Sequence, residues 1–107
     1  MPVPAEFELR VLLTVLRCRD QAYALAVHDD LERRTRRRAS LGAVYVTLDR
    51  LERKGLLHSA LGEPRAERGG RARRHYRLSR KGSATVRHAC LEMQHLWEGL
   101  EIAEERP

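Results

Sequence analysis

The apolar residues of this chain recur at helical spacing along most of its length, and the pattern changes between residues 56 and 79. There a short apolar run is followed by a loop rich in glycine and arginine, and then by a run in which Tyr76 and Leu78 alternate with polar residues. The fold expected from this order is mostly α-helical with a small β-hairpin. We predict helices at 5–18, 21–34 and 41–54, strands at 56–61 and 73–79, and a last helix from 80 to about 105.

Residues that begin or end helices stand at several of these borders. Asp20, Ser40 and Ser79 are suited to cap a helix N-terminus, because their side-chain oxygens accept hydrogen bonds from free backbone amides. Gly55 follows the third segment, where a left-handed glycine ends many helices. Three short helices followed by a two-stranded wing form a winged helix-turn-helix, in which the third helix is the recognition element.

Arginine dominates the charge of the chain. The 21 Lys and Arg residues outnumber the 15 acidic ones and give a net charge of +6, and Lys54 and Lys81 are the only lysines. A guanidinium presents a planar fork of donors that suits phosphates and base edges. The excess favours a polyanionic partner such as nucleic acid, although a soluble surface that is simply rich in arginine has the same composition.

Three groups of arginines that are far apart in sequence would meet on one face of a winged helix. They lie at 36–38, at Arg50 and in the loop between the strands. The third helix would then enter the major groove while the wing reaches phosphates or the adjacent minor groove. Two other interpretations stay open for the loop: a solvated arginine segment, or an RNA-binding segment marked by its single Arg-Gly-Gly sequence.

Several other classes of protein are not indicated. Cys18 and Cys90 have no zinc-site spacing and are expected to be reduced thiols. His88 and His95 lie seven residues apart on one helix face, but the histidines form no ligand set. We expect neither an enzyme nor a cofactor nor a metal, because no catalytic or phosphate-binding motif is present. The sequence shows no secretory signal and no membrane-spanning stretch, so a cytoplasmic protein is expected.

The first and last predicted helices carry extensive apolar surface. Phe7, Val11 and Val15 form one apolar stripe of the first helix, beside a second stripe of leucines. Both faces must be buried, and we expect one to pack against its own domain and the other against a partner helix. The last helix carries a heptad-type seam with spacings of 4, 3, 4 and 3 residues, starting at Val86 and ending at Leu100. This pattern favours a homodimer.

The segments SLGAVYVTLDRLERKGLLHS and RGGRARRHYRLSRKG resemble the PadR family of bacterial transcriptional regulators. The match is close from Ser40 to Gly82 and looser from Leu9 to Leu31. One departure is Tyr23-Ala24, where the family often has Tyr-Gly. The resemblance implies a dimeric winged-helix regulator, usually a repressor, that binds an inverted-repeat operator and dimerises through its C-terminal helix, near the first helix of the partner.

The resemblance also assigns roles to residues. Tyr76 has two competing roles, as a wing contact or as the aromatic that seals the wing to the domain, and we favour the second. The predicted DNA-binding residues come from the connector, the third helix and the wing: Arg38, Ser40, Ala43, Tyr45, Val46, Thr47, Arg50, Gly70, Arg71, Arg73, Arg74 and Tyr76.

The predicted dimer interface combines the first and last helices: Phe7, Val11, Val15, Val86, Cys90, Met93, Trp97 and Leu100. Trp97 is the only tryptophan. It is expected to pack the dimer core, but in some PadR-like dimers a flat aromatic compound binds between the C-terminal helices, and Trp97 would then be its effector contact.

The chain is therefore divided into a DNA-binding domain at 1–79 and a dimerisation helix at 80–107. Its expected partners are double-stranded DNA, a second copy of the chain and a small aromatic effector, without a membrane. The alternatives are an RNA-binding winged-helix protein and a winged-helix protein-interaction module that does not bind DNA.

Overall fold

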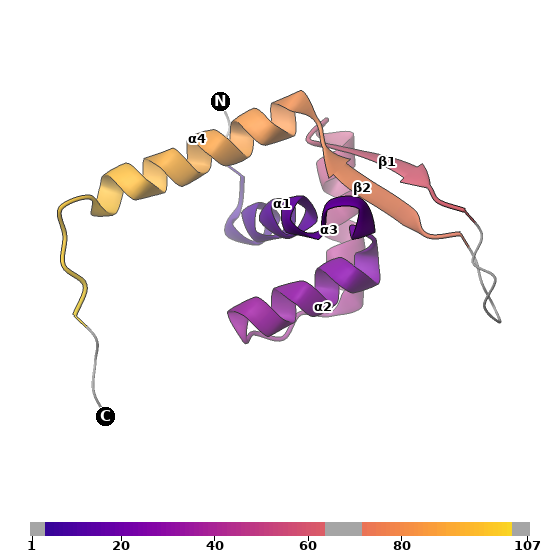
Figure 1. Ribbon diagram of the computed structural model, residues 1–107, viewed down its shortest axis with the longest axis horizontal. Helices are drawn as coiled ribbons and strands as arrows, with labels where there is room; N and C mark the ends of the chain where they lie inside the picture. The colour runs from indigo at the N-terminus through magenta and orange to yellow at the C-terminus, as the bar shows by residue number, and fades with distance from the viewer. Residues whose placement is uncertain (1–3, 64–71, 104–107) are drawn as a thin grey trace.

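The computed structural model describes residues 4–63 and 72–103. Three helices pack beside a two-stranded antiparallel sheet, and a long fourth helix extends away from them (Figure 1). The expected class of fold, mostly α with one β-hairpin, is confirmed. The elements in chain order are α1 (Glu6–Cys18), a 3₁₀ turn η1 (Arg19–Gln21), α2 (Ala24–Thr35), α3 (Leu41–Arg53), β1 (Leu57–Leu61), β2 (Arg74–Leu78) and α4 (Arg80–Trp97).

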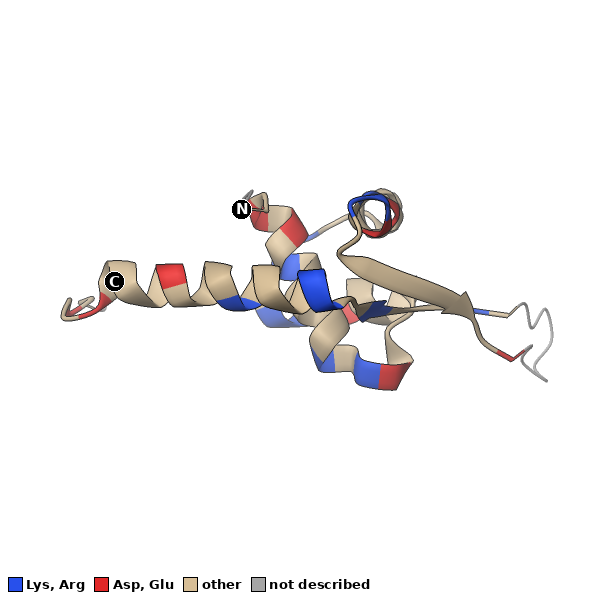
Figure 2. Ribbon diagram, turned by 90° about the horizontal axis from the view of Figure 1, so that it is seen from above, with Lys and Arg blue, Asp and Glu red and all other residues tan. Residues whose placement is uncertain are grey.

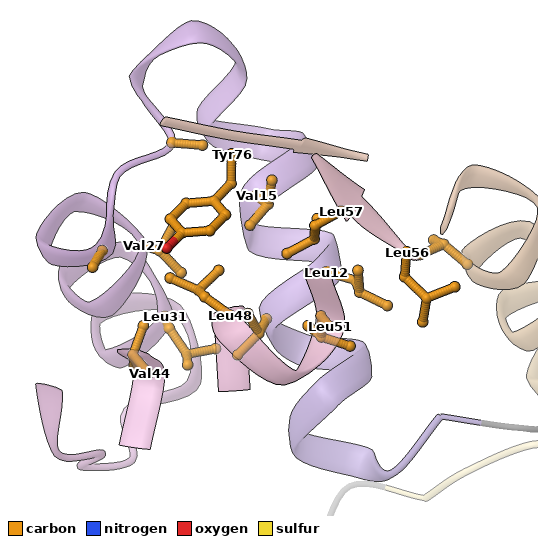
Figure 3. Close-up of a cluster of buried hydrophobic side chains, with 14 residues drawn as sticks. Leu12, Val15, Val27, Leu31, Val44, Leu48, Leu51, Leu56, Leu57 and Tyr76 are labelled. Atoms are coloured by element: carbon orange, nitrogen blue, oxygen red, sulfur yellow. The ribbon is translucent and has the colours of Figure 1, made fainter. Parts of the chain in front are cut away.

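The core lies where α1, α2, α3 and the hairpin meet. Each helix contributes one apolar face, as residues spaced three and four apart project from the same side. Burying such side chains contributes roughly 1.5–3 kcal/mol each, so this cluster is the main source of stability. Figure 3 shows the cluster, which includes Leu12 and Val15 of α1, Val27 and Leu31 of α2, Val44, Leu48 and Leu51 of α3, and Leu57 and Tyr76 of the hairpin.

The hairpin is joined to the helices by its second strand. In the β1–β2 pair, Leu57 is opposite Leu78 and Leu61 is opposite Arg74. On its other edge β2 forms a bridge between His75 and Tyr23, and the Tyr76 amide donates to the Ala22 carbonyl at 2.9 Å. The turn between α1 and α2 therefore acts as a short third strand and fixes the wing to the helical body.

The N-caps predicted for α3 and α4 from the sequence are confirmed. The Ser40 hydroxyl accepts a hydrogen bond from the Ala43 amide at 3.0 Å, and the Ser79 hydroxyl accepts one from Gly82 at 3.0 Å. Gly55 ends α3 with φ of +77°, a conformation that costs other residues more than glycine.

The prediction of Asp20 as a helix cap is wrong. Asp20 lies in η1, and α2 begins at Ala24 after the extended residue Tyr23. The reason is the bridge to β2, which requires Tyr23 to be extended and so delays the start of α2.

Helix α4 starts against the domain and then leaves it. A Cβ on Gly82 would lie 2.0 Å from the Leu56 carbonyl oxygen, so the first turn of α4 passes directly over that peptide. The helix ends at Trp97, eight residues before the predicted end, and Gly99 follows with φ of +78°. Leu100 is therefore not on the helix, and the predicted seam is one residue shorter.

The apolar stripes of α1 are arranged differently from the prediction. Val11 and Val15 are buried in the core, and Phe7 packs partly against it, whereas Leu13 and Leu16 are exposed. The fold of the chain itself covers the valine stripe, so Val11 and Val15 have no surface left for a partner. Leu41, at the first position of α3, is exposed, whereas Val44 is buried.

Candidate nucleic-acid interface

Helix α3 has one face that the rest of the domain leaves open. Tyr45 and Val46 are 53% and 57% exposed, although they lie in the middle of the helix. Ala43 and Arg50 are also exposed. A helix with this mixture of small, apolar and cationic side chains presents groups that can contact thymine methyl groups, base edges and phosphates.

Thr47 does not belong to this open face. It is only 4% exposed and lies on the buried side of α3, close in the helix to Val44, Leu48 and Leu51. Its place among the predicted DNA contacts implied an outward side chain, and that orientation is wrong, because Thr47 lies in the layer of side chains that α3 buries against the domain. Of the predicted α3 contacts, Ala43, Tyr45, Val46 and Arg50 remain accessible.

The connector between α2 and α3 is held at several points. Arg36 has φ of +56° and its amide donates to the Glu32 carbonyl at 2.8 Å, which closes the end of α2. An Arg37 guanidinium nitrogen lies 3.4 Å from a Glu6 carboxylate oxygen on α1. Arg38 is exposed, and Ser40 uses its hydroxyl as the α3 cap. Arg38 is therefore an available cation on an ordered segment.

The base of the wing is ordered by contacts of its arginines. The Arg73 guanidinium carbon lies 4.0 Å from the centre of the Tyr23 ring, in cation–π geometry. Arg74 donates to the Ser59 hydroxyl at 2.9 Å, and Ser59 donates to Glu52 at 2.6 Å. These contacts join the start of the second wing strand to the residue before α2, to β1 and to α3. The predicted contacts Gly70 and Arg71 lie outside the described residues.

Tyr76 takes part in the core rather than in the open surface. It is buried between β2 and the helices, and burial, reinforced by the charge of Glu52, raises the pKa of its phenol above 10.0. Its amide holds the wing to Ala22. The geometry therefore supports the structural role rather than direct contact with DNA.

Helix α3 and the wing line one shallow hollow. It is lined by Tyr45 and Val46 of α3 and by Arg74 and Tyr76 of β2. Asp49 also lines the hollow, and its carboxylate pairs with Arg53 at 2.8 Å. The structure thus brings Tyr45, Val46 and Arg74 onto one side of the domain.

One interaction that supports α3 was not found in the sequence. Glu8 on α1 is 4% exposed, and its two carboxylate oxygens lie 2.8 and 3.1 Å from Lys54 Nζ at the end of α3. Burial acts to raise the pKa of Glu8, but the bonds from Lys54 and from the Ala5 amide outweigh it and leave the pKa below 4.5. Because Glu8 and Lys54 are 46 residues apart, no local sequence pattern identifies them as partners.

Several large apolar side chains of α4 are exposed. Met93 and Trp97 are exposed, as are Leu91 and Leu96, while Val86 is buried against the domain. Cys90 is an exposed free thiol. The cations of α4 lie near the domain and its anions toward the C-terminal end, as Figure 2 shows. Cys90, Met93 and Trp97 of the predicted interface are therefore accessible.

Residues 4–63 and 72–103 contain neither a candidate metal site nor a helix that could span a membrane. Within these ranges no three His, Cys, Asp or Glu side chains are grouped so as to hold a metal ion. None of the helices in the same ranges is both long and apolar enough to cross a bilayer. His88, one of the two histidines noted on α4, lies 3.8 Å from Glu92.

Three helices, a wing joined to the turn between the first two, and an open face on the third define a winged helix-turn-helix protein. The model of the transcriptional regulator PadR-like family matches residues 12–88, which is most of the chain. The protein belongs to this family, and the resemblance inferred from the sequence is confirmed.

Solved structures agree with this assignment. A PadR family transcriptional regulator from Eggerthella lenta DSM 2243 is 27% identical, covers 87% of this chain and 82% of its own, and has a TM-score of 0.65. A PadR-like transcription factor from Bacteroides fragilis is 24% identical, with coverage of 84% of both chains and a TM-score of 0.66.

RosR of H. salinarum is 20% identical over 92% of this chain and 81% of its own, with a TM-score of 0.69. At identities below 25% the likeness is one of fold alone. None of the curated proteins matches the chain.

Proposed function

We propose that this protein is a sequence-specific DNA-binding transcriptional repressor that acts as a homodimer. The observation that carries the proposal is the shared surface of Tyr45 and Val46 on α3 and Arg74 on β2. Exposed α3 residues in the major groove would read bases, while the wing and connector arginines would bind phosphates. The net charge of +6 favours such a partner.

Residues at the ends of this surface would position the domain on the duplex. Arg38 is exposed before α3 and Arg50 is exposed on its open face, and Arg71 is expected to extend the contact along the wing. Arg73 and Arg74 already have partners within the domain, so their phosphate contacts would be shared with Tyr23 and Ser59. Pre-ordered arginines lose less conformational freedom on binding than free ones.

The exposed apolar side chains of α4 support the dimer. Met93, Leu96 and Trp97 are exposed toward one side of a helix that projects away from the domain, and Leu91 is exposed on another side. Such a surface is typical of protein interfaces. In this proposal residues 1–79 bind DNA and α4 within 80–107 joins two copies, with Leu13 and Leu16 of α1 as the surface that meets the partner helix.

A dimer would place two α3 helices in successive major grooves of an inverted-repeat operator and would exclude polymerase sterically. A flat aromatic effector that binds beside Trp97 would release DNA by changing the angle between the two domains. This mechanism needs no catalytic group, and it assigns the protein to the cytoplasm, where the DNA is.

The test is fluorescence anisotropy with duplex DNA from upstream of the gene of this protein, against a scrambled duplex of equal composition. We expect the upstream duplex to bind about 1000-fold more tightly, with a steep salt dependence. Arg50→Ala should weaken binding about tenfold and lower the salt slope by about one. Arg87→Ala is the matched control, because Arg87 is exposed on α4.

The same measurement separates the alternatives. Equal affinity for structured RNA and for the upstream duplex would favour the RNA-binding interpretation. If the protein dimerises but binds both duplexes equally weakly, without a salt-dependent difference between Arg50→Ala and Arg87→Ala, the repressor proposal fails and a protein-interaction module is indicated.

A further inference from the structure

Ala39, the residue before the N-cap of α3, forms hydrogen bonds with two side chains of α2. His28 Nε2 lies 2.8 Å from the Ala39 carbonyl oxygen, and the Ala39 amide donates to Glu32 Oε2 at 2.9 Å. His28 and Glu32 are one helical turn apart, and Nε2 lies 3.6 Å from the same Glu32 oxygen. Two side chains of one helix thus fix both polar groups of the residue that leads into the recognition helix.

The surroundings of the His28 ring select its protonated form. Its Nδ1 lies 2.9 Å from Asp29 Oδ1, while Nε2 faces the Ala39 carbonyl. Both neighbours are acceptors only, and a neutral imidazole has a single N–H, so it can satisfy one of the two. The imidazolium donates to both. The geometry alone therefore favours a charged ring.

The charges around the ring act in the same direction. Asp29 and Glu32 are the charged groups that act on it, both are anionic and both belong to α2, and the connector contributes the neutral Ala39 carbonyl. The hydrogen bond to Asp29 raises the pKa of His28 above 6.5, against the opposing effect of burial. The His28 side chain is mostly covered, whereas that of Asp29 is largely open to solvent.

A shift of Ala39 would move the residues on both sides of it, which belong to the candidate nucleic-acid interface. The exposed Arg38 precedes it, and Ser40, the cap of α3, follows it. The other end of α3 is held by the Glu8–Lys54 pair. Release of Ala39 would therefore loosen Arg38 and the first turn of α3 without unfolding the helix.

We propose that His28 and Glu32 are positioning residues for DNA recognition, and that the imidazolium of His28 holds the connector and the start of α3 in the geometry that reads bases. The inference rests on the proposed DNA-binding function. Neither side chain needs to touch DNA, because both act through Ala39.

The sign of the pH dependence follows from the two contacts. Below the raised pKa of His28 the ring donates to Asp29 and Ala39 together, and the connector is fixed. As pH rises through that pKa, the ring keeps one N–H, which the Asp29 carboxylate accepts more strongly than a neutral carbonyl does, so the contact with Ala39 is lost and the connector loosens. The preference for specific over scrambled DNA should therefore fall as pH rises, while binding to scrambled DNA, which depends on phosphates, changes less.

The experiment measures both affinities by anisotropy between about pH 6 and about pH 9, a range that brackets an ordinary and a raised histidine pKa. The probes are the upstream duplex and its scrambled counterpart. For the wild type we expect the preference to fall about tenfold across the range, since a charge-assisted hydrogen bond is at stake. His28→Gln, which keeps donors but cannot be protonated, should show a reduced and flat preference.

His88→Gln is the matched control. His88 also stands four residues before a glutamate, Glu92, at 3.8 Å, but on exposed α4 and without a backbone partner among the contacts found. Its profile should follow that of the wild type. Glu32→Gln keeps an acceptor for the Ala39 amide while removing the charge, and should lower the pH at which the preference falls.

A second readout does not depend on DNA. Amide hydrogen exchange of Ala39, relative to Ser83 in the first turn of α4, should accelerate in the free wild-type protein as His28 deprotonates, and should be fast at every pH in His28→Gln. If the wild type prefers the upstream duplex but His28→Gln keeps both its preference and its pH profile, this inference is overturned and the proposed function stands. If no duplex is preferred at any pH, the proposed function fails, and the inference fails with it.

Discussion

Lys54 Nζ contacts both carboxylate oxygens of Glu8, at 2.8 and 3.1 Å, and so connects the end of α3 to α1. Glu8 is buried and Lys54 is half-exposed, so the pair is anchored on the α1 side. The position of α3 therefore depends on the ion pair. If Lys54 is removed, the buried negative charge of Glu8 has lost this partner.

Replacing Lys54 with Met should therefore lower the free energy of unfolding at neutral pH by about 2 kcal/mol. This is less than for a fully buried pair, because half of the lysine is in water. Urea denaturation measures the change. Arg53→Met, next to it on the exposed side, is the control and should change stability by less than about 0.5 kcal/mol.

The Glu8–Lys54 pair also predicts that the free energy of unfolding falls at acidic pH. The folded-state pKa of Glu8 lies below 4.5, so its contribution is complete above that pH and is lost as pH falls through the lowered pKa. The stability difference between wild type and Lys54→Met should therefore shrink below about pH 4.5. A difference that stays constant down to about pH 2 would show that the pair does not form.

Gly82→Ala should destabilise the protein by about 3 kcal/mol, because the new methyl group would overlap the Leu56 carbonyl oxygen and force α4 away from the domain. Gly42→Ala tests the same change inside α3, where the nearest atom lies 4.0 Å away. It should stabilise the protein by about 0.5–1 kcal/mol through helix propensity. Equal effects at both glycines, measured by thermal unfolding, would contradict the close approach of α4.

Thr47→Val and Val46→Ala should affect different properties. Thr47 is buried, so its replacement should leave the affinity for the upstream duplex within about twofold of wild type. Val46 is exposed, and the loss of its methyl groups should reduce the preference for that duplex several-fold without loss of stability. Anisotropy and denaturation on both variants check this, and a specific loss at Thr47 would reverse the assignment of faces.

Trp97 reports on the proposed dimer without any label. It is the only tryptophan, and in the single chain it is 51% exposed. Burial against a second copy should shift its emission to shorter wavelength as concentration rises, in step with the mass measured by analytical ultracentrifugation. Leu96→Glu should prevent both changes, since a buried carboxylate without a partner is costly. A monomeric mass at all concentrations would refute the dimer.

Local signals predicted the parts of the fold that depend on neighbouring residues. The α3 helix was predicted to within one residue of its observed end, because Ser40 and Gly55 act through their own turns. The predicted end of α4 was wrong, although Gly99 carried the signal, because helical spacing of apolar residues continues beyond it.

Features that depend on distant parts of the chain could not be predicted in this way. Periodicity shows that α1 has two apolar stripes, but only packing decides that Val11 faces inward and Leu13 outward. The burial of Thr47 and the grip of His28 on Ala39 arise from contacts between elements, so neither has a signature in the local sequence.

The bond from the Tyr76 amide to the Ala22 carbonyl also has a consequence for how the chain is made. A two-stranded hairpin is at best marginally stable alone, so the wing depends on the α1–α2 turn for its order. That turn leaves the ribosome before β2 is synthesised. Pairing of β2 with the turn closes a long loop of the chain. Helix α3 is therefore synthesised before the core that it packs into is complete. Folding is completed only after β2 has emerged.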